Sequence, residues 1–182
     1  MTDVELYRQL LGLCDPWQVV AVDLSPQERQ VSVQVEAKAD TQWHCPICQQ
    51  PCPGYDAREE RRWRHLDSCA FETWLVASLP RVECPEHGVK TVSVPWAAPH
   101  SRFTLAFACF AVRVLRATQV QSQAASLLRL TPAEVNYLME REVRAGLARR
   151  REGADLAPEP LAHLTLDEKH YGHPQRYLTV LP

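Results

Sequence analysis

The sequence lacks any run of apolar residues long enough for a membrane span or a signal peptide, and two of its first five residues are acids. We therefore expect a cytoplasmic protein. Internal repeats and low-complexity tracts are also lacking, apart from one short run of arginines. With 46% hydrophobic and 23% charged residues, the 182-residue chain belongs to neither the disordered nor the fibrous class.

The sequence also lacks an even number of cysteines: it has seven, so at least one cannot be paired within the chain. In a chain without an export signal this disfavours a disulfide framework. Two residues separate Cys45 from Cys48 and Cys84 from His87, and 35 residues lie between the two pairs. Two such pairs of soft ligands place four donors tetrahedrally around zinc. Since four protein ligands leave the metal no open position, we predict structural zinc.

Accidental spacing of four reduced side chains is the alternative, and two matched pairs argue against it. The insert between the pairs is interpreted as a hairpin, with strands at 62–67 and 71–78 that return the chain to the first pair. Gly88 suits the tight turn after His87. Cys52 offers a fifth donor near the first pair and leaves the ligand set open. The other cysteines lie among apolar neighbours in the sequence and are expected to pack as small hydrophobic residues: Cys14, Cys69 and Cys109.

The periodicity of apolar residues changes along the chain. A short helix at 3–13 precedes two valine-rich stretches that predict a hairpin, whereas from Phe103 the apolar spacing is that of helices, two more of which follow at about 119–129 and 132–149. These patterns predict an α+β protein with four segments: an N-terminal helix and β-rich zinc ribbon at 1–100, an all-α segment at 101–151, a linker at 152–162 and a strand pair at 163–182.

Lysine is absent from residues 101–151, which hold nine arginines and three glutamates, a net charge of +6 in a chain whose total is −2. Such a basic segment favours nucleic acid over membrane. Thr131, Pro132 and Glu134 supply an N-cap, a first-turn proline and a capping box. A short helix, a brief turn and a capped basic helix predict a helix-turn-helix that enters the major groove. A helical bundle with a solvated arginine face is the alternative.

Asn136, early on the second helix, is the candidate for reading a base, because asparagine can form two hydrogen bonds with adenine. Six of the nine arginines of this segment are candidates for DNA contact, and the final three are interpreted as phosphate contacts, which add affinity without sequence information. The arginines proposed are Arg129, Arg141, Arg144, Arg149, Arg150 and Arg151.

The order of these parts and the motifs CPIC, WRHLD, RVECPEHGVKTVSVPWA and LDEKHYGHPQRYLTV resemble the N-terminal portion of a bacterial insertion-sequence transposase of the ISL-three family, over residues 5–180. Enzymes of this family cut and rejoin DNA with an Asp, Asp, Glu triad on a ribonuclease-H-like fold. The resemblance implies that Asp167 is the first of these carboxylates. It also implies the zinc ligands Cys45, Cys48, Cys84 and His87.

Cleavage by two Mg or Mn ions needs carboxylates from later strands, which one aspartate cannot replace. We therefore expect a truncated transposase with an incomplete catalytic core, in which Asp167 is inert and DNA binding is retained. Its partner would be double-stranded DNA, in particular transposon-end repeats, with no membrane, and a homodimer is the assembly considered. The alternatives are a zinc-ribbon and helix-turn-helix regulator without catalytic ancestry, and a zinc scaffold with no nucleic-acid role. By residue chemistry alone, Asp167 would be an edge carboxylate on a small hairpin.

Overall fold

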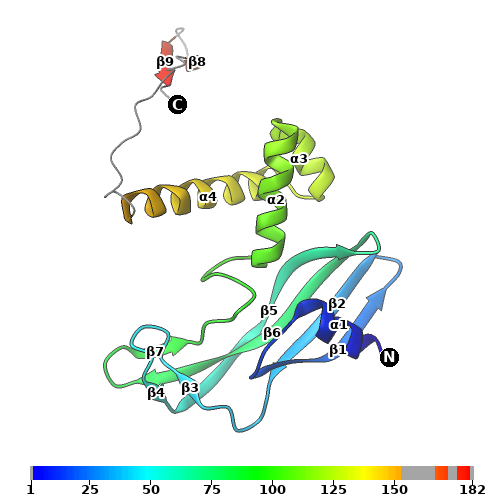
Figure 1. Ribbon diagram of the computed structural model, residues 1–182, viewed down its shortest axis with the longest axis vertical. Helices are drawn as coiled ribbons and strands as arrows, with labels where there is room; N and C mark the ends of the chain where they lie inside the picture. Colours follow the sequence, from blue (N-terminus) through cyan, green and yellow to red (C-terminus); the bar gives the residue numbers. More distant parts are fainter. Residues whose placement is uncertain (1, 153–166, 172–175, 181–182) are drawn as a thin grey trace. The chain divides into compact units, whose positions relative to one another are not determined.

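The computed structural model of the chain describes residues 2–152, 167–171 and 176–180, and the side chains of residues 2–146 (Figure 1). It comprises two units, residues 1–140 and 141–182. The first unit contains α1 (Asp3–Leu11), β1 (Trp17–Ser25), β2 (Gln30–Ala37), β3 (Trp43–His44), β4 (Pro51–Cys52), β5 (Gly54–Ser68), β6 (Phe71–Cys84), β7 (Gly88–Thr91), α2 (Leu105–Thr118) and α3 (Gln121–Leu128). Helix α4 (Pro132–Glu152) crosses the boundary, and the second unit also holds β8 (Asp167–Tyr171) and β9 (Arg176–Val180).

Helix α1 begins and ends at residues suited to those positions. The Thr2 hydroxyl accepts a hydrogen bond from the Glu5 backbone N–H at 3.2 Å, which satisfies one of the free donors of the first turn. Gly12 ends the helix with φ of 56°, a left-handed conformation that glycine adopts without steric cost. The predicted N-terminal helix is confirmed, and it ends two residues earlier than expected because of this glycine.

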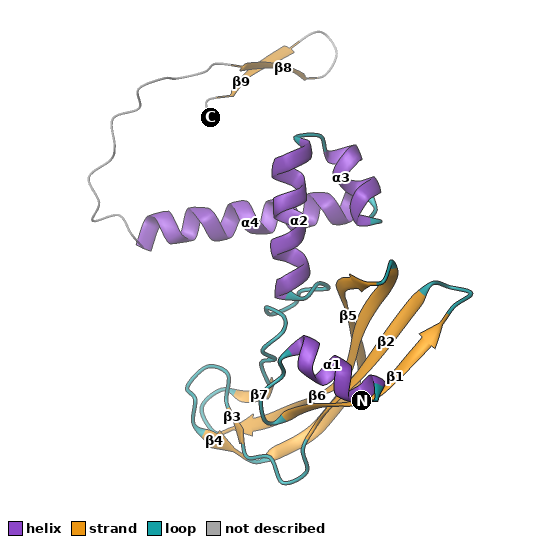
Figure 2. Ribbon diagram, turned by 45° about the vertical axis from the view of Figure 1, so that its right-hand side comes forward, coloured by secondary structure: helices purple, strands orange, loops and turns teal. Residues whose placement is uncertain are grey.

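The main sheet has the strand order β1-β2-β6-β5, and β7 pairs with the C-terminal end of β6 (Figure 2). The predicted valine-rich hairpin is confirmed as the antiparallel pair of β1 and β2. Its alternating residues Val31, Val33 and Val35 are buried, as period-two patterning requires. Strand β2 also pairs in parallel with β6, from Gln30 opposite Glu72 to Gln34 opposite Val76. No local pattern in the sequence predicts this long-range pairing.

The hairpin of β5 and β6 is much longer than the sequence indicated. Its pairing runs from Gly54 opposite Val82 to Ser68 opposite Phe71, whereas the predicted strands covered only 62–67 and 71–78. The first seven residues of β5 are exposed and carry no apolar alternation, so nothing in them predicts a strand. Their backbone pairing follows from β6, whose buried residues alternate with less buried ones along most of its length.

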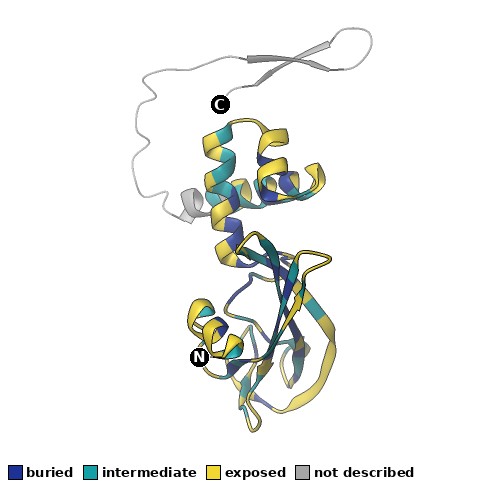
Figure 3. Cartoon of the chain, turned by 90° about the vertical axis from the view of Figure 1, so that its right-hand side faces the viewer, coloured by how far each residue is buried: buried dark blue, intermediate teal, exposed yellow. Residues whose placement is uncertain are grey.

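The buried residues of the first unit, dark blue in Figure 3, form two hydrophobic clusters. In one, on the sheet, Trp96 meets the rings of Trp17 and Trp63 edge-on, at centroid distances of 4.9 and 5.6 Å. The other lies among the helices and includes Phe103, Phe107, Ala111, Leu128 and Leu138. Each large apolar side chain so buried contributes about 1.5–3 kcal/mol relative to exposure. Two clusters therefore stabilise the sheet and the helices through largely different residues.

Helices α2, α3 and α4 confirm the predicted change of period after Phe103. The backbone of β8 and β9 pairs from Asp167 opposite Val180 to Tyr171 opposite Arg176, which confirms a terminal strand pair. Most of the predicted linker, residues 153–162, lies outside the described residues. The division at residues 100, 151 and 162 stays a prediction, and the α+β class is confirmed. No helix in the described part of the chain is long and apolar enough to cross a membrane.

Candidate metal centre and nucleic-acid interface

Two turns of the sheet domain bring four side chains together. The ligand atoms of Cys45, Cys48, Cys84 and His87 all lie within 4.8 Å of one another. The separations are 3.7 Å between the Sγ atoms of Cys48 and Cys84, 3.7 Å from Cys45 Sγ to His87 Nδ1 and 3.5 Å from Cys84 Sγ to that nitrogen. A tetrahedron with metal–sulfur bonds of about 2.3 Å has edges of about 3.8 Å. The residues therefore fit a four-coordinate zinc ion.

Backbone pairing shapes the two turns. Cys45 follows β3, its N–H donates to the Gln50 carbonyl at 2.9 Å, and Trp43 lies opposite Cys52 in the pair of β3 and β4. Cys84 ends β6 opposite Gly88, the first residue of β7. Gly88 has φ of 65°, so the predicted tight turn after His87 is confirmed. The β5 and β6 hairpin returns the chain to the first turn, as predicted for the insert.

The surroundings of the thiols favour the ionised form at two positions. The backbone N–H groups of Cys48 and Ile47 lower the pKa of Cys45. Burial alone would raise the pKa of Cys84, but the N–H groups of Glu86 and His87, together with the neighbouring thiols, lower it to about 7. Because the thiolate is the metal-binding form of cysteine, these N–H groups prepare Cys45 and Cys84 to bind a cation.

Cys52 and the remaining cysteines lie outside the four-residue cluster. Cys52 is buried, its Sγ donates to the Gln50 carbonyl at 3.4 Å, and burial raises the pKa of its thiol. The prediction that Cys14, Cys69 and Cys109 are packing residues is wrong, because all three are exposed. Cys69 occupies the turn of the long hairpin and Cys109 lies beside the exposed Phe110 on α2. Apolar neighbours in the sequence do not place a residue on the buried face of its element.

The start of α4 has the predicted capping box. The Thr131 hydroxyl accepts from the Glu134 N–H at 3.3 Å, while the Glu134 carboxylate accepts from the Thr131 N–H at 2.9 Å. Val135 and Leu138 are buried on the inner side of the helix, and Ala124 and Leu128 are buried on α3. Helix α3, a short turn and α4 therefore form the helix-turn-helix with a packed interior.

Most of the candidate DNA contacts lie along α4. Asn136 is exposed near its start, and its Nδ2 donates to the Glu140 carboxylate at 2.9 Å. Arg141 is half-buried and Arg144 is exposed. The backbone of Arg149–Arg151 continues the helix, and the side chains of these three residues lie outside the described residues. Their predicted roles in DNA contact stay predictions.

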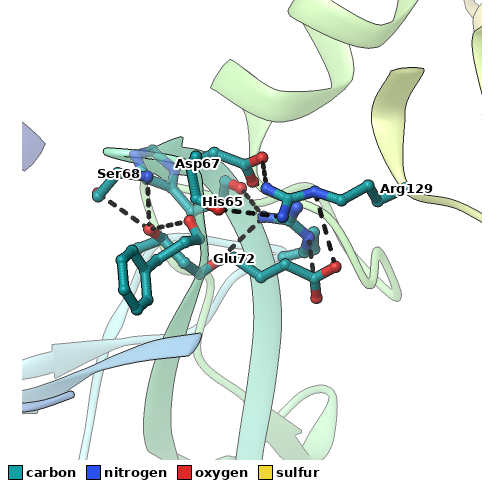
Figure 4. A network of polar contacts seen from close by, with 9 residues as sticks. His65, Asp67, Ser68, Glu72 and Arg129 are labelled. Carbon is teal, nitrogen blue, oxygen red and sulfur yellow. Dashed lines mark hydrogen bonds and ion pairs between the residues drawn. The ribbon is translucent and has the colours of Figure 1, made fainter. Parts of the chain in front are cut away.

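Arg129 lies in a different environment from the other candidates. It occupies the turn between α3 and α4, and its guanidinium is directed to the tip of the β5 and β6 hairpin (Figure 4). There it donates to the Ala70 carbonyl at 3.0 Å and pairs with the carboxylates of Asp67 and Glu72. No pattern in the sequence predicts this network, although Asp67 belongs to the WRHLD motif.

Arg64 and His65 of the same motif complete the network and were also missed. Arg64 is only 1% exposed, and it pairs with Asp67 and lies 3.9 Å from a carboxylate oxygen of Glu72. His65 Nδ1 is 3.0 Å from the hydroxyl of Thr104, the N-cap of α2. Burial of the ring and the positive charge of Arg64 lower the pKa of His65 to about 4. The signal for this network in the sequence is a charged residue, Arg64, within a stretch that is otherwise predicted as a strand.

Fold and site thus define a protein in which a zinc-ribbon domain is followed by a helix-turn-helix. Residues 41–87, which contain the four clustered side chains, match the family described as the zinc-finger of transposase IS204/IS1001/IS1096/IS1165. The transposases for insertion sequence element IS1557 from two strains of Mycobacterium tuberculosis are each 30% identical to the chain over 189 residues. The aligned region is 100% of this chain and 40% of each relative. No solved structure matches the chain.

The chain is therefore similar over its whole length to transposases for insertion sequence element IS1557, and its residues 41–87 match a zinc-finger family of transposases. The resemblance noted from the motifs is confirmed. The chain spans less than half the length of the relatives that it matches.

Proposed function

We propose that the chain is the DNA-binding part of an insertion-sequence transposase, in which zinc orders the ribbon and the helix-turn-helix binds duplex DNA at transposon-end repeats. The observation that carries this proposal is the similarity of the whole chain to transposases for IS1557. The capped basic helix supports it, since that element suits the major groove. A homodimer would match an inverted pair of ends and stays a prediction.

The proposed zinc ligands are Cys45, Cys48, Cys84 and His87. Zinc held by four protein groups supplies folding free energy and has no open position for a substrate. Metal analysis of the purified, reduced chain should find about one zinc per molecule. Cys48→Ser should lose the metal, whereas Cys52→Ser, the matched control outside the cluster, should keep it. Zinc lost from both variants would make Cys52 part of the ligand set.

Duplex binding is proposed to depend on the arginines of α4, with Asn136 reading an adenine. Fluorescence anisotropy with a random duplex at several salt concentrations tests this, because each phosphate contact contributes about 0.9 to the slope of log affinity against log salt. Replacing Arg149, Arg150 and Arg151 by alanine should reduce that slope by about 2–3. Arg8→Ala, which removes an exposed arginine from α1, should leave it unchanged. Binding that ignores salt would contradict the proposal.

Asp167 is proposed as the first carboxylate of a transposase catalytic core, where Mg or Mn would be held together with two further carboxylates. The 182-residue polypeptide should therefore bind DNA without cutting it. A nicking assay with Mg or Mn tests this on supercoiled plasmid. Cleavage that Asp167→Ala abolishes would show that Asp167 is active without those partners.

A further inference from the structure

Arg129 is one of the residues through which the helix-turn-helix contacts the zinc-ribbon domain. It ends α3 in the left-handed conformation, with φ of 54°, and its N–H donates to the Ala125 and Ser126 carbonyls. The direction in which its side chain leaves the helix pair is thus set by the turn itself. An arginine at this position was expected to face DNA, but the side chain extends to the hairpin tip instead (Figure 4).

The hairpin tip presents acceptors that match a guanidinium. Cys69 and Ala70 both have positive φ, 51° and 67°, as in a tight two-residue turn, and this turn presents the Ala70 carbonyl to Arg129 at 3.0 Å. On either side of the turn, Asp67 and Glu72 add carboxylates, and Glu72 Oε1 lies 4.0 Å from the Nε of Arg129. Three acceptors from one turn therefore surround one planar donor group.

The charges of this cluster balance without DNA. Asp67 and Glu72 are shared between Arg129 and Arg64, so two carboxylates face two guanidiniums. Arg64 is buried and needs a carboxylate nearby, which keeps Asp67 and Glu72 in place. A DNA phosphate would have to compete with these acceptors for the guanidinium of Arg129.

A second contact holds the first turns of α4 from another segment. The Tyr137 hydroxyl donates to the His100 carbonyl at 3.5 Å, and its ring lies 6.1 Å from that of Phe103. Arg129 just before α4 and Tyr137 on its second turn therefore anchor the helix start to two parts of the zinc-ribbon domain. Asn136, the proposed base reader, lies between these two anchors in the sequence.

We propose that Arg129 is a positioning residue that docks the helix-turn-helix on the hairpin tip through Asp67, Ala70 and Glu72, and so sets the orientation in which α4 meets DNA. This inference rests on the proposed DNA binding. It replaces the DNA contact expected for Arg129 with a contact inside the protein. The β5 and β6 hairpin of the zinc-ribbon domain thereby holds the start of α4 in place.

The test is a double-mutant cycle on duplex affinity with Arg129→Ala, Asp67→Asn and both together. Each single change should weaken binding about tenfold with an unchanged salt slope, and the double variant should be no weaker than Asp67→Asn alone, because the effects of contacting residues are not additive. Removal of a negative charge by itself should strengthen DNA binding. Weaker binding after Asp67→Asn would therefore support the docking role of Asp67. Arg113→Ala, an exposed arginine on α2, is the matched control.

Arg129→Lys separates the two roles further. Lysine keeps the charge that a phosphate needs, but it lacks the planar fork that meets three acceptors, so we expect it to behave like Arg129→Ala. A salt slope reduced by about 0.9 in Arg129→Ala, with normal binding by Arg129→Lys and tighter binding by Asp67→Asn, would overturn the proposal in favour of a phosphate contact.

Hydrogen exchange of the free protein keeps this inference distinct from the proposed function. Arg129→Ala and Asp67→Asn should both speed amide exchange at residues 130–137, and Arg113→Ala should not. If the wild-type chain binds no duplex, the proposed function fails, while faster exchange in these variants still establishes the docking. Unchanged exchange in both variants would overturn the positioning role whether or not DNA binds.

Discussion

Arg64 shows how a single residue can join two parts of this protein. Its backbone N–H donates to the Arg102 carbonyl at 2.9 Å and its carbonyl accepts from the Thr104 N–H at 3.0 Å, so the chain before α2 is bonded to β5. Its guanidinium lies 5.1 Å from the centre of the Phe107 ring in the helical cluster. A buried charge costs several kcal/mol unless it is paired, and Asp67 supplies the partner. The WRHLD motif is therefore explained by a junction between strand and helix.

His65 makes stability at this junction depend on pH. Its pKa in the folded protein is about 4, below the ordinary 6.5, so the unfolded chain binds more protons between these values. The resulting stability is fully present above pH 6.5 and is lost as pH falls toward 4. The shift corresponds to about 3 kcal/mol at most. Urea unfolding should therefore show a difference between wild type and His65→Asn that narrows from pH 7 to pH 4. A difference independent of pH would contradict this cause.

At the scale of residues, the sequence predicted the cluster of cysteine and histidine side chains better than the surroundings of Arg129. Ligand spacing of two residues is a local constraint, so the cluster of Cys45, Cys48, Cys84 and His87 could be read from the chain alone. The partners of Arg129 come from a hairpin about sixty positions away in the sequence, and no local pattern records such a contact. The same limit applies to Cys109, whose burial depends on which face of α2 packs.

The ends of an element could be predicted from the sequence where residues at those ends cap it locally. Helix α4 begins at Pro132 because Thr131 and Glu134 satisfy its free donors locally. Strand β5 begins eight residues before its predicted start at 62, because that extension is held by pairing with β6 and not by apolar alternation. The parallel pairing of β2 with β6 is likewise a tertiary property. Local signals thus fix helix ends, while distant strands fix sheet ends.

The capping box gives a direct test at the scale of one element. Thr131→Ala removes the side-chain acceptor for the Glu134 N–H and should destabilise the protein by about 1 kcal/mol. The matched control Ser126→Ala removes an exposed hydroxyl inside α3 and should change stability by less than about 0.5 kcal/mol. Denaturant midpoints monitored by helical circular dichroism provide the measurement. Equal effects of the two variants would show that the box contributes nothing beyond a hydroxyl.

The first unit contains two hydrophobic clusters, and the proposed metal ligands contribute to only one of them. The sheet cluster contains Cys45 and Cys84 together with the tryptophans, whereas the helical cluster contains no member of the metal site. Structural zinc contributes about 10–16 kcal/mol in small zinc domains, which equals or exceeds the stability of a typical domain. Loss of zinc should therefore affect the sheet domain first and most strongly.

Removal of zinc by a chelator under reducing conditions should unfold the two metal-binding turns while the helices persist. Amide exchange should rise at residues 43–52 and 84–91, because β3, β4 and β7 are short strands whose turns end at the ligands. Helical circular dichroism should be largely retained, because Phe103, Phe107 and Leu138 pack without any metal ligand. The matched control is the same treatment of Cys48→Ser, which should already show the fast exchange before chelator is added. Simultaneous loss of the helical signal would mean that the β5 and β6 hairpin couples both clusters into one cooperative unit, and the separation inferred from their packing would then be wrong.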